Sequence, residues 1–164
     1  MELIKHKKWC RNMASYKIHN INNFSKEKFI DLVKENENQF IPPLSQRVEL
    51  DNYLNKILTS AENYILFDDS LHTIASAVSC YANNGKYGFI TMVLTDSRFR
   101  GKGYAVTLLK HVIADVFSRG YSEINLEVHK ENNRAIKLYK GLGFVFNSCN
   151  ITDYRIMTLV AHSD

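Results

Sequence analysis

The sequence is poor in cysteine and has no long hydrophobic run, and each shortage excludes a class of protein. Its three cysteines, Cys10, Cys80 and Cys149, lie far apart, so they predict neither a disulfide framework nor a zinc site. No apolar stretch approaches the roughly 18 residues that cross a bilayer, and residues 1–11 lack the pattern of a secretory signal. The sequence therefore predicts a cytoplasmic protein with reduced thiols, no metal and no membrane partner.

The excess of positive over negative charge is also small. The formal net charge is only +4, and the one basic cluster, formed by Lys5, Lys7, Lys8 and Arg11, lies within residues 1–14. A nucleic-acid-binding domain usually carries a denser basic patch, so we interpret this cluster as a solvated basic arm and expect no nucleic-acid partner. The length of 164 residues and the 45% hydrophobic content predict one globular domain over 1–164.

Hydrophobic periodicity predicts an α/β chain with a mixed sheet. Apolar residues recur at helical spacing in the ranges 26–38, 47–61, 104–118 and 132–142. Strand patterns occupy the ranges 15–20, 63–67, 73–82, 87–95, 122–128 and 154–162. The nearly continuous apolar run in 87–95 indicates a strand buried on both faces. The preceding Asn84-Gly85 predicts a tight hairpin in which both residues adopt positive φ.

Between that buried strand and an amphipathic helix lies the segment Arg100-Gly101-Lys102-Gly103-Tyr104-Ala105. Its glycines let a ligand approach the backbone, and the helix start offers unpaired N–H groups. Arg98, Arg100 and Lys102 add positive charge, so the segment predicts a pyrophosphate-binding site. A P-loop sequence is absent, and Val106 replaces the third glycine of the dinucleotide fingerprint. Taken alone, the segment fits a tight surface connection equally well.

A second segment, residues 132–144, lies at the end of the next expected strand. Asn132, Ala135 and Tyr139 follow the spacing Asn-x-x-Ala-x-x-x-Tyr, and Gly143-Phe144 completes the pattern. With this pattern and the Arg-x-x-Gly-x-Ala of residues 100–105, the chain resembles the GCN5-related N-acetyltransferase (GNAT) superfamily. The resemblance is specific over 87–146 and only architectural before Tyr87.

The resemblance implies a single-domain α/β fold with a twisted, mixed and mostly antiparallel sheet. Its central parallel pair would splay apart for coenzyme A, and the strand over 87–95 would carry a bulge. Residues 15–86 would form the acceptor side, 87–146 the acetyl-CoA-binding core and 147–164 a C-terminal strand region. The last strand also offers an edge at which a second copy of the chain could pair.

The resemblance also implies residue roles. The Val93 N–H would face the thioester carbonyl, and Thr95 would pair with pantetheine through its backbone. Asn132 would contact the pantetheine arm. The Tyr139 hydroxyl would lie near the sulfur as a hydrogen-bond donor, since a tyrosine pKa near 10 exceeds a thiol pKa near 8.5. The pyrophosphate would be held by Arg100, Gly101, Lys102, Gly103, Tyr104 and Ala105.

The base that deprotonates the amine is less defined. Some relatives that acetylate protein N-termini use a glutamate in the register of Glu127, and a surface or structural carboxylate explains Glu127 equally well. His72 and His129 are further candidates that we interpret as surface residues. Three tyrosines could line a substrate pocket or simply pack across strands, namely Tyr81, Tyr87 and Tyr154.

Three functions compete, and we prefer the first. It is an N-acetyltransferase that moves acetyl from acetyl-CoA to a primary amine of a small molecule or protein N-terminus, by direct attack in a ternary complex. The second is a non-catalytic acyl-CoA-binding module of the same fold. The third is a nucleic-acid-binding protein, which depends on positive charge alone. No dense acidic cluster indicates a polycationic acceptor, so small amines, amino sugars, amino acids and protein N-termini all stay open.

Overall fold

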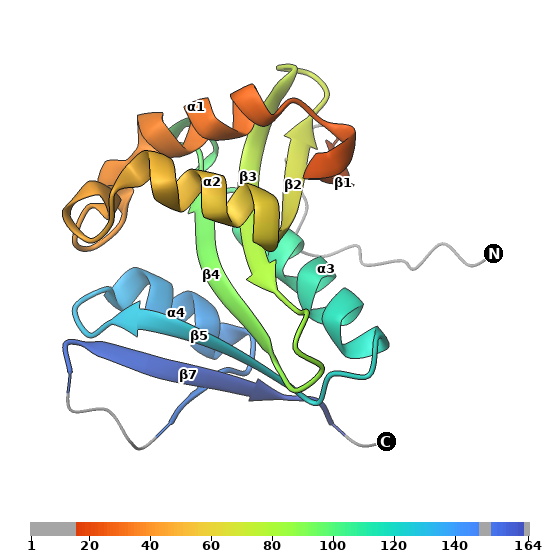
Figure 1. Ribbon diagram of the computed structural model, residues 1–164, viewed down its shortest axis with the longest axis vertical. Helices are drawn as coiled ribbons and strands as arrows, with labels where there is room; N and C mark the ends of the chain where they lie inside the picture. Colours follow the sequence, from red (N-terminus) through yellow and green to blue (C-terminus); the bar gives the residue numbers. More distant parts are fainter. Residues whose placement is uncertain (1–15, 148–151, 163–164) are drawn as a thin grey trace.

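A computed structural model describes residues 16–147 and 152–162 of the chain (Figure 1). The basic arm, Cys10 and Cys149 lie outside these residues. The strands are β1 (Tyr16–Asn20), β2 (Glu62–Asp68), β3 (Thr73–Tyr81), β4 (Gly88–Thr95), β5 (Glu123–His129), β6 (Val145–Phe146) and β7 (Tyr154–Val160). The α-helices are α1 (Lys26–Asn36), α2 (Leu50–Ser60), α3 (Tyr104–Ser118) and α4 (Asn133–Gly141). Within the described residues, no helix is both long and apolar enough to cross a bilayer.

All seven strands form one sheet in the order β1-β2-β3-β4-β5-β7-β6. Every neighbouring pair is antiparallel except β4 and β5, which confirms the expected mixed, mostly antiparallel sheet. The parallel pairing covers only Gly88 to Ile90 on β4 and ends there. Beyond Ile90 the two strands diverge, as Figure 1 shows.

Each face of the sheet carries its own core. Helices α1 and α2 cover one face, where Phe29 and Ile57 pack with Met92. Helices α3 and α4 cover the other, where Leu108 and Tyr139 pack with Ile90. Ile90 and Met92 would share one face of a regular strand. They enter different cores because the β3–β4 register shifts by one residue at Thr91, a bulge that rotates the rest of β4.

Two expectations about turns and helix starts are wrong. Helix α2 begins at Leu50 rather than at 47, because the Glu49 side chain caps it by accepting from the N–H groups of Asp51 and Asn52. In the β3–β4 connection only Gly85 has positive φ. Asn84 instead uses its side-chain oxygen to accept from the backbone of Lys86 and Tyr87, which closes the turn without a left-handed asparagine.

Two expectations about strands also need correction. Strand β4 is not buried on both faces, since Phe89, Thr91, Val93 and Thr95 are only half-buried. Beyond Ile90, the departure of β5 leaves Val93 and Thr95 without a neighbouring strand on that side. The edge expected on the last strand is partly taken, because β7 lies between β5 and the two-residue β6. In the described residues β6 is therefore the outer strand, and pairing with a second copy stays a prediction.

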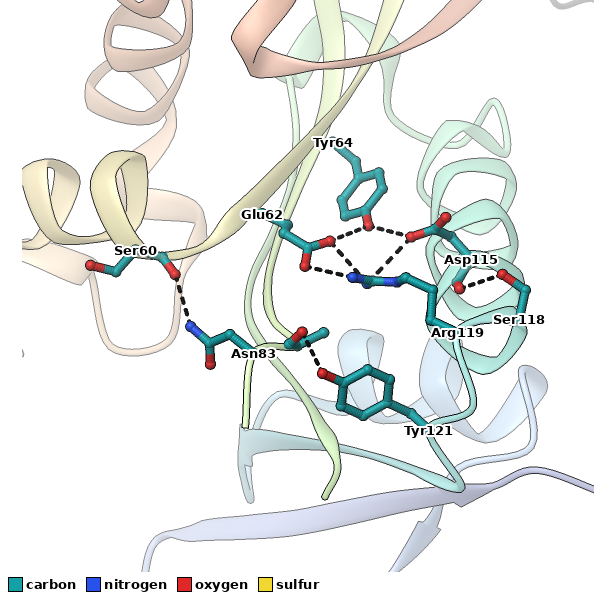
Figure 2. Close-up of polar contacts among 9 residues, drawn as sticks. Ser60, Glu62, Tyr64, Asn83, Asp115, Ser118, Arg119 and Tyr121 are labelled. Atoms are coloured by element: carbon teal, nitrogen blue, oxygen red, sulfur yellow. Dashed lines mark hydrogen bonds and ion pairs between the residues drawn. The ribbon is translucent and has the colours of Figure 1, made fainter. Parts of the chain in front are cut away.

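A polar cluster fastens the end of α3 to the start of β2 (Figure 2). The Tyr64 hydroxyl lies 2.7 Å from both Glu62 Oε2 and Asp115 Oδ2, although its single proton can be donated to only one carboxylate at a time. Arg119 binds Glu62 through both terminal nitrogens and lies 3.4 Å from Asp115. This cluster orients α3, whose other end begins at Tyr104, directly after the loop of residues 100–103.

At that other end, Tyr104 anchors the start of α3 to the β2–β3 turn. Its hydroxyl donates to the buried carboxylate of Asp68 at 3.0 Å. Asp68 also accepts from the Ser70 hydroxyl and from the N–H groups of Ser70 and Leu71. The Ser70 hydroxyl, followed by these other donors, holds the pKa of Asp68 below its usual range.

Replacing Asp68 with alanine should lower the free energy of unfolding by about 2 to 3 kcal/mol at pH 7, because it leaves a buried hydroxyl and turn N–H groups unpaired. A depressed carboxyl pKa stabilises the fold above the unfolded value, near 3.9, and this contribution disappears as pH falls through the folded value. Urea unfolding should therefore show the difference shrinking below about pH 4. Asp69→Ala in the same turn is the control, and an equal loss there would contradict this role for Asp68.

Candidate active site

The divergence of β4 and β5 opens a cleft of about 160 Å³. Its walls come from the α1–α2 connection, from β4, from β5 and from the first turns of α3 and α4. Six of the eleven residues to which the sequence assigned a catalytic or coenzyme-binding role line it: Val93, Thr95, Ala105, Glu127, Asn132 and Tyr139. The remaining five are the loop residues Arg100 to Gly103 and Tyr104, the first residue of α3, just before the cleft-lining Ala105.

The outer half of β4 presents free backbone groups to the cleft. Asp96, just after the strand, donates its N–H to the Ala75 carbonyl of β3 at 3.0 Å. Because backbone groups alternate in direction along a strand, the N–H groups of Val93 and Thr95 point away from β3. No residue of β5 pairs with β4 at these positions. This edge of the strand can therefore accept an extended ligand as an additional hydrogen-bonded partner.

The loop before α3 suits an anion. Gly101 and Gly103 have φ of +73° and +83°, a left-handed conformation that side chains disfavour. The first intrahelical bond joins the Thr107 N–H to the Gly103 carbonyl, so the N–H groups of Tyr104 and Ala105 have no intrahelical acceptor. They emerge at the positive end of the helix dipole.

The basic side chains of this loop are not equivalent. Arg98 binds both carboxylate oxygens of Asp96, at 3.0 and 2.7 Å, so its charge is partly offset and its contribution to an anion site stays a prediction. The same ion pair holds the pKa of Asp96 below its usual range. Arg100 and Lys102 have no carboxylate partner among the described residues, so no ion pair within those residues offsets their positive charge.

A hydrogen-bond chain joins this loop to the acceptor side. The buried Asn36, at the end of α1, accepts from the Ser97 N–H at 3.2 Å and from the side chain of Gln39. Gln39 in turn accepts from Arg100 Nε at 3.0 Å. The residues that follow Gln39, Phe40 and Ile41, line the cleft. Sequence patterns carry no signal for Asn36 or Gln39, because amides without regular spacing look like surface residues.

Tyr139 offers a buried, unpaired hydroxyl. The residue is only 8% exposed and lines the cleft, and its ring packs edge-on against Phe144. Within the part of the chain that the structure describes, the hydroxyl has no hydrogen-bond partner. Burial raises the pKa of Tyr139, which keeps the phenol protonated and able to donate. A buried polar group without a partner is uncommon and suggests that a ligand completes it.

Asn132 carries out a structural task. Its side-chain oxygen accepts from the Ala135 N–H at 3.1 Å and so caps α4. The cap does not use the amide NH₂, and Asn132 is one of the residues that line the cleft. The cap and a ligand contact are therefore compatible.

The acceptor end of the cleft gathers an ion pair and aromatic rings. Arg47 Nη2 lies 3.8 Å from Glu127 Oε1, and its guanidinium carbon lies 4.1 Å from the centre of the Tyr154 ring. His129 packs edge-on against the same ring. Arg47 is a cleft residue that the sequence did not indicate, because it was expected to begin a helix. His72, Tyr81 and Tyr87 are not among the residues that line the cleft.

No group of three His, Cys, Asp or Glu side chains in residues 16–147 and 152–162 is arranged to hold a metal. The expected absence of a metal stays a prediction. The one described cysteine, Cys80, is buried on β3, and burial raises the pKa of its thiol to about 12, so it is not a nucleophile.

Curated proteins that match part of this chain include two named N-alpha-acetyltransferase 30. N-alpha-acetyltransferase 30 of Xenopus laevis is 40% identical over 58 residues, which are 35% of this chain and 21% of that protein. N-alpha-acetyltransferase 30 of Saccharomyces cerevisiae is 32% identical over 89 residues, 50% of this chain and 51% of that protein. The chain thus spans about half or less of the curated relatives that it matches.

Solved structures share the fold. The PaiA N-acetyltransferase of Thermoplasma acidophilum in complex with coenzyme A matches with a TM-score of 0.72 and 18% identity, over 90% of this chain and 99% of that one. A chain of the NatC complex bound to Gag peptide and CoA matches with a TM-score of 0.68 and 23% identity, over 92% and 100%. The model of the acetyltransferase (GNAT) family matches residues 27–144. The chain therefore belongs to the acetyltransferase (GNAT) family.

Proposed function

We propose that the protein transfers an acetyl group from acetyl-CoA to a primary α-amine. The observation that carries this proposal is the convergence of three features on one cleft: an unpaired edge of β4, the N-terminus of α3 with its unbonded N–H groups, and the buried hydroxyl of Tyr139. An extended chain ending in a pyrophosphate fits the first two, and a reacting group that needs a donor fits the third. The family uses acetyl-CoA, which would supply the acetyl group as a thioester.

The residues would divide the work by position. Val93 would aim its N–H at the thioester carbonyl oxygen, and Thr95 would pair with the pantetheine arm. Asn132 would add its amide NH₂ to that arm. The pyrophosphate would lie against the N–H groups of Gly101, Gly103, Tyr104 and Ala105, with Arg100 and Lys102 beside it.

Charge that develops during transfer explains the two donors. As the C–N bond forms and the C–S bond breaks, negative charge appears first on the carbonyl oxygen and then on sulfur. A fixed N–H at the first position is worth about 3 kcal/mol in comparable oxyanion holes. Tyr139 would donate a hydrogen bond to the leaving sulfur while keeping its proton, since its pKa is raised above a reference value that already exceeds that of a thiol.

The proton on the amine favours an α-amine over a lysine side chain. An α-amine with a pKa near 8 is neutral in roughly one molecule in ten near pH 7, whereas lysine is neutral in roughly one in a thousand. Glu127 lines the cleft and is half-exposed, so it can pass the remaining proton to solvent. Relatives named as N-alpha-acetyltransferases support the same acceptor class.

The test is release of free coenzyme A thiol with a panel of amines near pH 7. We expect turnover with short peptides that have a free N-terminus, and none with the same peptides after N-terminal blocking, even when they contain lysine. Turnover on lysine alone would refute the α-amine acceptor. Acetyl-CoA binding without turnover on any amine would indicate the non-catalytic module instead.

A further inference from the structure

Arg47 reaches across the acceptor end of the cleft. It follows the short 3-10 helix Leu44–Gln46, and its guanidinium stacks on Tyr154 of β7 while lying 3.8 Å from Glu127 of β5. Stacking on an aromatic face fixes the plane of the guanidinium and leaves its edges open. Arg47 is therefore held in position by one face and presents its N–H groups within the plane.

Those N–H groups are not used. No hydrogen bond joins the Arg47 side chain to any described residue, and 3.8 Å is too long for one to Glu127. By contrast, Arg98 and Arg119 each direct two nitrogens onto a carboxylate, Asp96 and Glu62. A guanidinium matches a carboxylate by two parallel hydrogen bonds. Arg47 offers the same pairing to something outside the described chain.

The charge of the cleft agrees with this. Its charged lining residues are Arg47, Arg134 and a single acid, Glu127. These three residues together carry one net positive charge, which disfavours a polycationic acceptor and favours one that brings a negative group. Arg47 and Glu127 lie close enough to meet both ends of a small zwitterion, because an extended residue spans about 3.3 to 3.6 Å.

We propose that the acceptor carries a carboxylate within about one residue of its reactive amine, and that Arg47 binds this carboxylate while the amine lies toward Glu127. The inference depends on the proposed function and defines its substrate class. Two acceptor types meet the description. One is a free α-amino acid, and the other is a peptide with an acidic side chain in its first or second residue.

Matched acceptor pairs test the proposal. One pair is an amide-capped tripeptide with aspartate in second place and its asparagine twin; the other is free alanine and alaninamide. We expect wild-type kcat/KM to favour the acid in at least one pair by about tenfold or more, the size of a charged hydrogen-bonded contact. Which pair responds identifies the acceptor type. Arg47→Met should bring that ratio close to one, and Arg47→Lys should restore part of it, because lysine keeps the charge but not the fork.

Arg155→Met is the control, since Arg155 neighbours Tyr154 on β7 but packs over Phe146. It should keep the wild-type ratio. If Arg47→Met lowers both members of a pair equally, or if wild type shows no preference for either acid, the proposal is wrong and Arg47 only fastens the loop. Calorimetric binding of the same pairs to the coenzyme A complex gives a second readout that needs no turnover. Acetyl-CoA binding should stay unchanged in all variants, so its absence in wild type would count against the proposed function and not against Arg47 alone.

Discussion

Replacing Gly103 with glutamate should reduce acetyl-CoA affinity by about a hundredfold or more while the protein stays folded. Gly103 is the N-cap of α3 and has a φ of +83°. A side chain there costs about 1 to 2 kcal/mol of backbone strain, but a carboxylate at a helix N-terminus returns much of it. That carboxylate would occupy the anion site and repel the pyrophosphate. Calorimetric titration with acetyl-CoA measures the loss.

Gly85→Glu is the matched control. Gly85 has a similar φ of +71° and has open space around it. It lies in the β3–β4 connection and not in the loop before α3. It should lose some stability, which thermal unfolding measures, and bind acetyl-CoA normally. If both variants bind as wild type does, the loop before α3 is not a phosphate site.

Replacing Tyr139 with phenylalanine should lower kcat by about a hundredfold and leave acetyl-CoA affinity nearly unchanged. The hydroxyl has no partner among the described residues, so its removal breaks no internal hydrogen bond and should not destabilise the protein. A loss of rate without a loss of stability separates a catalytic donor from a packing residue. Single-turnover thiol release and urea unfolding on the same preparation give both quantities.

Tyr64→Phe provides the opposite pattern. The Tyr64 hydroxyl lies between Glu62 and Asp115 (Figure 2). Tyr64 is not among the residues that line the cleft. Its removal should cost about 1 kcal/mol of stability, since both carboxylates are partly exposed and can bind water instead. Its kcat should stay as in wild type. Full turnover by the Tyr139 variant would remove that hydroxyl from the proposed mechanism.

Sequence patterns predicted those parts of the fold that depend on residues close together in the chain. Gly101 and Gly103 before an amphipathic helix indicated the loop that precedes α3, and apolar alternation in 122–128 indicated β5. The Thr91 bulge and the parting of the strands followed only from family resemblance, because backbone hydrogen bonds leave no mark on side-chain spacing. The same reason explains the wrong prediction for the hairpin turn, which a hydrogen bond to the Asn84 side chain closes without a positive φ at Asn84.

Contacts between distant segments were not predictable. Arg98 and Arg100 look alike in the sequence, yet Asp96 binds one and Gln39 orients the other. Arg47 meets Glu127 and Tyr154 only because the sheet brings the end of β5 and the start of β7 to the α1–α2 connection. Such pairings depend on tertiary geometry, and no local period records them.

The bonds from Asn36 and Gln39 to Ser97 and Arg100 connect the loop before α3 with the α1–α2 connection, so under the proposed function they would couple the binding of the two substrates. If bound coenzyme steadies the α1–α2 connection, it raises the affinity for the acceptor by some factor. Bound acceptor must then raise the affinity for the coenzyme by the same factor. A lineage that remodels residues near Gln39 to accept a new amine would therefore alter its coenzyme affinity as well. Acceptor preference and coenzyme affinity would then evolve together rather than one at a time.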